Sequence, residues 1–129
     1  MRRRVVRSAL LAGTLLLGTA DAARVPTVAQ TSTAPTLGGV VLELSLTPRD
    51  QNDELQGVWS PGTRAKLLDC AARCRVVLGV PLRGPLRLDR QSRYRVVLGG
   101  SFQPGRKIGV LLSFRSGVAA TEVVVGAER

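Results

Sequence analysis

Two cysteines, Cys70 and Cys74, are the residues whose type and spacing predict a specific chemistry. Three residues separate them, and they lie between two segments that we expect to be strands, so a hairpin would place them opposite each other. A disulfide accepts about 4.4–6.8 Å between the two α-carbons. In an oxidising compartment this bond would stabilise the fold by about 2 kcal/mol. The alternative is a pair of thiolates that binds a soft metal such as copper(I).

Histidine is absent from the sequence, and the one methionine is Met1. Imidazole is therefore excluded as a general base, as the partner of a nucleophile and as a zinc ligand. The acidic residues are scattered over expected turns, chain ends and single strand positions, and we interpret them as surface groups. No glycine-rich phosphate loop joins a strand to a helix, so nucleotide binding is not indicated either. We therefore expect a protein that is not an enzyme and has no catalytic residues.

The first 22 residues have the layout of a secretory signal peptide. Four arginines precede an apolar stretch at residues 8–20, and a small-residue cleavage site ends at Ala22. The apolar stretch has 13 residues, whereas a membrane-spanning helix needs roughly 20. We predict cleavage after Ala22 and export to the periplasm or the exterior of a bacterial cell, without a membrane span in the mature protein.

The chain is basic, with a formal net charge of +10, and a balance of +7 remains after residues 1–22 are removed. Acidic proteins and phospholipid headgroups are therefore candidate partners. Nucleic acid is not expected, because an exported chain with one Trp, one Tyr and two Phe has little surface for base stacking. Most arginines are interpreted as a solvated face. The alternative is a contact surface for an acidic partner at Arg75, Arg93 and Arg95.

Period-two alternation of apolar residues dominates the sequence after Gly39. Residues 40–46 are typical of a half-buried strand, and residues 107–114 place four apolar side chains on one face of a strand that should be central. Residues 23–38 lack periodicity and are expected to be a flexible lead into a domain at residues 39–129. Further strands are expected at residues 54–59, 64–70, 74–80, 86–88, 93–98 and 118–125.

Short strands separated by Pro-Gly and Gly-Gly turns, with no helical periodicity, predict an all-β fold. Seven or eight strands in about 90 residues favour an antiparallel β-sandwich of immunoglobulin-like architecture, in which two sheets share one core.

Several segments resemble the periplasmic copper chaperones of the PCu(A)C family. Residues 53–61 (DELQGVWSP) are similar to its Leu-x-Gly-Val-x-Ser-Pro segment, and residues 80–88 to its Ile-Pro-Ala-Gly-Gly stretch. Residues 94–98 (YRVVL) resemble its Tyr-His-x-Met-Leu motif, and residues 104–114 its closing Pro-x-Gly and Val-x-Leu-x-Phe pattern. The resemblance covers residues 40–126. It implies a cupredoxin-like sandwich that carries copper(I) in the periplasm to a copper-receiving envelope protein.

The same resemblance implies a ligand set of two histidines and two methionines, which this chain lacks. Arg95 stands at the position of the histidine in the His-x-Met pair, and Val97 at that of the methionine. An arginine has no lone pair for copper, and its charge repels the ion.

Two functional hypotheses follow. One is a divergent copper(I) carrier that uses Cys70 and Cys74, and the other is an envelope interaction module with a structural disulfide and no metal.

Overall fold

The structure is a computed structural model that describes residues 24–126, and more than half of these residues lie in strands. The predicted export signal at residues 1–22 lies outside these residues. Within residues 24–126 there is no helix with the length and apolar character needed to cross a membrane. The strands are β1 (Thr27–Thr36), β2 (Gly39–Thr47), β3 (Asp53–Trp59), β4 (Arg64–Asp69), β5 (Arg75–Val77), β6 (Val80–Leu82), β7 (Leu86–Leu88), β8 (Tyr94–Gly99), β9 (Lys107–Phe114) and β10 (Gly117–Val124).

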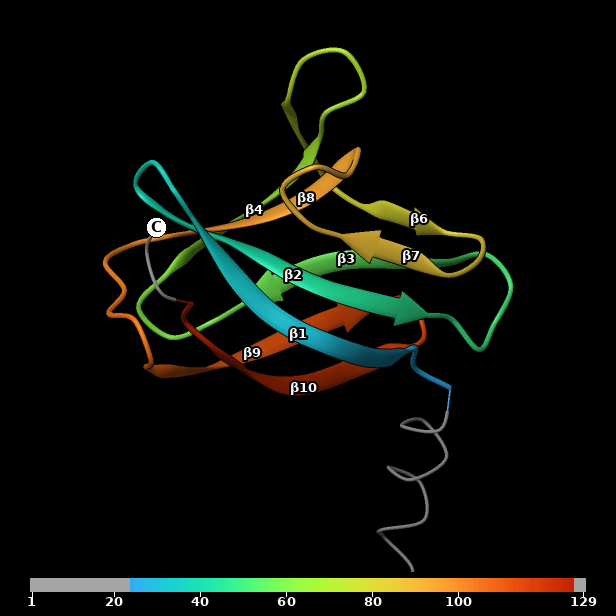
Figure 1. The fold of residues 1–129 in the computed structure, drawn as a ribbon. Coiled ribbons are helices and arrows are strands. Elements are labelled where there is room, and N and C mark those ends of the chain that lie inside the picture. The colour runs from blue at the N-terminus through green and yellow to red at the C-terminus, as the bar shows by residue number, and fades with distance from the viewer. Residues whose placement is uncertain (1–23, 127–129) are drawn as a thin grey trace, which may run out of the picture.

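The strands form two antiparallel sheets that pack face to face (Figure 1). One sheet has six strands in the order β1-β2-β8-β4-β5, with β7 also paired to β2, and the other has four strands in the order β10-β9-β3-β6. This arrangement confirms the predicted all-β antiparallel sandwich. It also confirms that β9 is central, because β9 lies between β10 and β3.

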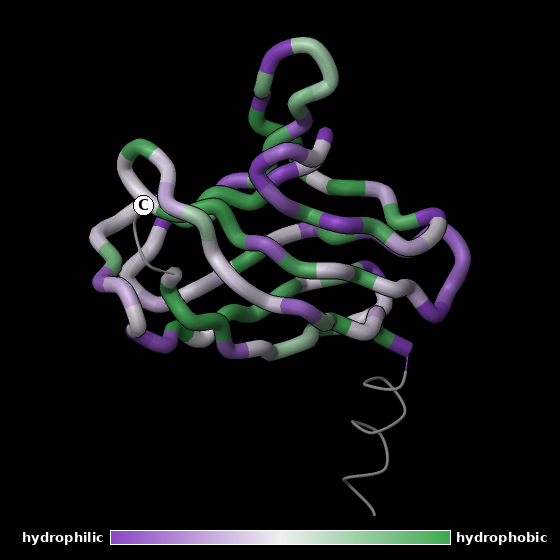
Figure 2. The backbone as a smooth tube through the Cα atoms, in the orientation of Figure 1, coloured by the Kyte–Doolittle hydropathy of each residue, from purple (hydrophilic) through white to green (hydrophobic). Residues whose placement is uncertain are grey.

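The core lies between the two sheets and consists of the side chains that point inward, which are alternate residues along a strand. Leu42, Leu44 and Leu46 of β2 are fully buried, as the period-two pattern predicts. On β9, Leu112 is fully buried and Phe114 nearly so. Figure 2 shows hydrophobic and hydrophilic residues alternating along several of these strands. Burial of these side chains supplies the main favourable free energy of the fold.

The expectation of a flexible segment at residues 23–38 is wrong for most of its length, because Thr27–Thr36 form β1 and pair with β2. The register shifts between Ala29 and Ser32, and Gln30 has a φ of 55° there. This bulge breaks the period-two pattern, so the sequence shows no strand signal.

The strand predicted at residues 74–80 is also corrected. It is two strands in different sheets, β5 and β6, and the chain crosses between them at Leu78 and Gly79. The apolar pattern of residues 74–80 continues across this crossing, so the sequence did not indicate that the chain changes sheet there.

Candidate binding site at the β4–β5 hairpin

The hairpin between β4 and β5 is closed by a disulfide between Cys70 and Cys74, the first of the two alternatives for this pair. The cysteines lie just outside the two strands, in the bend itself, and their α-carbons are 3.9 Å apart. This distance is below the range expected for cysteines that face each other on strands. Figure 1 shows the loop projecting beyond the rest of the sandwich at the top of the view.

Asp69 joins this hairpin to β8. Its carboxylate is almost fully buried and accepts hydrogen bonds from Nε of Arg93 at 2.9 Å and from Nη2 of Arg93 at 3.1 Å. The backbone N–H of Ala71 donates to it at 3.1 Å, and Arg75 lies 3.8 Å away. The hydrogen bond from Arg93 holds the pKa of Asp69 below its ordinary value, and the same bond raises the pKa of Arg93. Asp69 is therefore a carboxylate that holds Arg93 in place and attracts the exposed Arg75.

Sequence reasoning missed this role of Asp69 and treated it as a surface group. Strand alternation could have indicated that Asp69 is buried. Leu67 faces the core, and Asp69, two positions further along the same strand, faces the same side. Its partner Arg93 is 24 residues away and is brought close by the pairing of β4 with β8.

The arginines predicted as a contact surface occupy different settings. Arg93 binds Asp69 and stacks over the ring of Tyr94, with its guanidinium carbon 4.9 Å from the ring centroid. Arg75 is mostly exposed beside the same carboxylate. Arg95 is half-buried on β8, opposite Leu68, and its Nε donates to the carbonyl of Ser92 at 2.8 Å.

The turn before β8 holds Arg95 in position. Asp89 accepts hydrogen bonds from the hydroxyl of Ser92 and from the backbone N–H of Gln91, each at 2.8 Å. The hydrogen bond from Ser92 is the main cause of a lowered pKa at Asp89. The carbonyl of Ser92 also accepts the hydrogen bond from Arg95. The turn that contains the ionised Asp89 therefore orients this arginine.

A shallow hollow of about 280 Å³ lies at the base of the loop. Its charged lining is Arg73, Arg75, Arg93 and Asp69, and Ala71 and Ala72 complete it. The single carboxylate is neutralised by Arg93 and Arg75, so the hollow keeps a positive charge. Such a surface attracts a carboxylate or a phosphate group.

Comparison with solved structures identifies the fold. A copper-bound PCuAC domain from PmoF2 superimposes with a TM-score of 0.61 at 21% sequence identity. The match covers 78% of this chain and 91% of that chain. The chain has a PCuAC-like fold. No protein-family model matches the chain, and no curated protein does so either.

The PCuAC-like frame does not carry the ligands that the resemblance implies. Arg95 and Val97, at the positions of the histidine and methionine, offer no lone pair to a soft metal. Cys70 and Cys74 are bonded to each other. Within residues 24–126, no cluster of three or more His, Cys, Asp or Glu side chains is arranged to hold a metal ion. The oxidised hairpin therefore does not fit a copper site.

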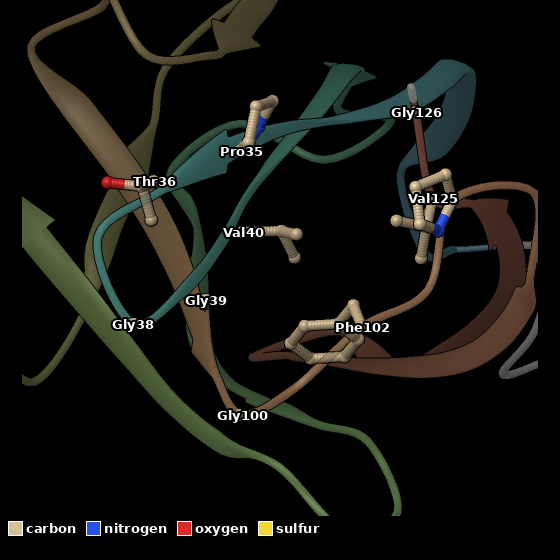
Figure 3. A pocket seen from close by; sticks show the side chains of 10 residues that line it. Pro35, Thr36, Gly38, Gly39, Val40, Gly100, Phe102, Val125 and Gly126 are labelled. Atoms are coloured by element: carbon tan, nitrogen blue, oxygen red, sulfur yellow. The ribbon is translucent and has the colours of Figure 1, made fainter. Parts of the chain in front are cut away.

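A second hollow, of about 270 Å³, lies at the other end of β8, where β2 and β8 meet (Figure 3). Val40, Phe102 and Val125 line it together with several glycines, and the hydroxyl of Thr36 is the only polar side-chain group in the lining. It has no titratable side chain, so it offers no charged group to a ligand.

Proposed function

We propose that the protein is an exported, non-enzymatic module of the bacterial cell envelope that binds an acidic partner through the basic hairpin end of a PCuAC-like sandwich. The observation that carries this proposal is the hollow in which Asp69 neutralises only part of the charge of Arg73, Arg75 and Arg93. The two hydrogen bonds to Asp69 hold Arg93 in place, so this arginine loses little conformational entropy when it binds an anion.

The replacement of the copper ligands supports the same proposal. Arg95 occupies the position of a histidine on the outer side of β8, which adds a cation to the end of the domain where the resemblance places a metal. A position that the resemblance assigns to a soft-metal ligand would in this chain attract an anion instead.

A direct test uses labelled poly-L-glutamate as the acidic probe. We expect the Arg73→Gln/Arg75→Gln variant to bind it at least about fivefold more weakly than the unmodified protein, because two guanidinium contacts are lost. Binding should weaken as the salt concentration rises. Fluorescence anisotropy titrations measure both effects.

The matched control is the Arg83→Gln/Arg106→Gln variant, which removes the same charge from two exposed positions away from the hairpin. Equal loss of affinity in the two variants would mean that only net charge matters, and the proposed site would be rejected.

Copper(I) carriage is a second candidate function, and one pair of observations favours it. The fold matches a copper-bound PCuAC domain, and the two cysteines are close together on one hairpin. Two-electron reduction of the disulfide by an external dithiol would yield two thiols, which can bind copper(I) as thiolates. We propose this activity for the reduced protein only.

The expected result is one copper(I) bound per reduced protein and none per oxidised protein, measured by competition with a chromophoric copper(I) chelator. Cys70→Ser should abolish uptake, whereas Ala72→Ser in the same loop should not change it. Unchanged copper uptake by the Cys70→Ser variant would show that the hairpin cysteines do not bind copper(I).

A further inference from the structure

The outer face of β5, β4 and β8 combines exposed aliphatic side chains with cations. Val76, Leu68 and Arg95 form one row across the three strands, because Leu68 pairs with both of the others. Lys66 and Val97 form the next row on β4 and β8. Leu78, which follows β5, is 93% exposed, and Val76 is 63% exposed. We call Val76, Leu78, Lys66 and Arg95 the hairpin face.

Exposure of two aliphatic side chains at one projecting edge leaves apolar surface in water that a partner can cover. Elsewhere on the molecule Leu37 is just as exposed, but it lies alone at the tip of the β1–β2 turn. On the hairpin face, Val76 and Leu78 are two residues apart, and the strand pairing places Val76 on the same side of the sheet as Lys66 and Arg95. The apolar and cationic groups are therefore arranged to bind the same surface.

Few carboxylates lie near these cations. The one acidic residue within β4, β5 and β8 is Asp69, which is buried and paired with Arg93. Glu54, which approaches the backbone at Gly79, is paired with Arg115 at 3.6 Å. Glu43 on the neighbouring β2 accepts a hydrogen bond from Ser32, and the register of β2 with β8 places it opposite Arg95. The hairpin face therefore has two cations, Lys66 and Arg95, against this one carboxylate. An anionic surface is thus complementary in charge to the hairpin face.

We infer that the hairpin face binds the surface of an anionic phospholipid membrane, with Val76 and Leu78 at the headgroup–acyl boundary and Lys66 and Arg95 on lipid phosphates. This inference rests on the proposed function and names its acidic partner. A bilayer fits better than a protein pocket, because the apolar groups project and are aliphatic, whereas protein interfaces concentrate aromatic anchors in shaped pockets. Aliphatic insertion beside Lys and Arg is the usual chemistry of peripheral membrane binding.

The test is sedimentation of the oxidised protein with vesicles of phosphatidylcholine and phosphatidylglycerol in equal amounts. Pure phosphatidylcholine vesicles should bind much less of the protein. Val76→Ser/Leu78→Ser should lower the affinity for the mixed vesicles about tenfold, because both apolar contacts are lost. The matched control is Leu37→Ser/Val118→Ser, which removes one leucine and one valine of similar exposure elsewhere and should leave binding unchanged.

Lys66→Gln/Arg95→Gln should also weaken vesicle binding and reduce its dependence on salt. Equal binding by the Val76→Ser/Leu78→Ser variant and the unmodified protein would overturn the inference, since attraction would then be purely electrostatic. Binding to poly-L-glutamate without binding to the mixed vesicles would also overturn it, while leaving the proposed function in place with an acidic protein as partner. Absence of binding to both poly-L-glutamate and the mixed vesicles would reject the proposed function and this inference together.

Discussion

Replacement of Leu44 by alanine should lower the free energy of unfolding by about 2–5 kcal/mol, one of the two largest effects that we expect from a single substitution in this domain. Leu44 is fully buried on β2, opposite Leu88 of β7. Alanine would remove three buried carbon atoms and leave a cavity between two sheets that are held apart by their other side chains. Domains of this size are stable by only about 5–15 kcal/mol, so the loss is a large share of the total.

Urea unfolding followed by circular dichroism measures this change, with Leu37→Ala as the control. Leu37 is fully exposed at the β1–β2 turn, so its truncation should change the free energy of unfolding by less than about 0.5 kcal/mol. A similar midpoint for the two variants would contradict the assignment of the core.

Much of the architecture could be predicted from local pattern. The alternation in β2 and β9 indicated which side chains face inward, and the structure confirms these faces. The PCu(A)C resemblance of short motifs on several strands predicted a fold that the comparison with a solved structure supports at 21% identity. These features could be predicted because each depends on residues close together in the sequence.

The missed features depend on pairing between distant segments. β1 became a strand because β2 offers it a partner, and hydroxyl groups of its threonines bond across to β10: Oγ1 of Thr33 donates to the carbonyl of Val124 at 3.4 Å. The role of Asp69 follows in the same way from the pairing of β4 with β8. No local pattern contains either partner.

The candidate site, like the fold, could be predicted only in part. The spacing of Cys70 and Cys74 predicted the disulfide, and the absence of histidine from the sequence excluded the implied copper ligands. The arginines were predicted as a group, but their different settings were not. Arg93 is committed to Asp69, so Arg73, Arg75 and Arg95 retain more capacity to meet a partner.

The second large effect is expected at Gly39, which the sequence marked only as the start of the folded region. Gly39 pairs with Gly99 where β2 meets β8, next to the hollow in Figure 3. A β-carbon at Gly39 would collide with the backbone carbonyl of Leu98 and lie 3.0 Å from the α-carbon of Gly99. Backbone atoms of a paired strand cannot rotate aside as a side chain does, so β2 and β8 would have to separate at this end.

Gly39→Ala should therefore lower the free energy of unfolding by on the order of 1–3 kcal/mol, measured by urea unfolding. Gly109→Ala is the matched control, because Gly109 also lies within a strand, β9, but an added β-carbon there has no atom within 4 Å. That variant should be unchanged or more stable by about 0.5–1 kcal/mol, since alanine loses less backbone entropy on folding. Equal stability of the two variants would show that β2 and β8 do not approach as closely as described. Arg95 lies on β8 and Lys66 on the neighbouring β4, so a separation of β2 from β8 that reaches the hairpin face should also weaken vesicle binding by Gly39→Ala.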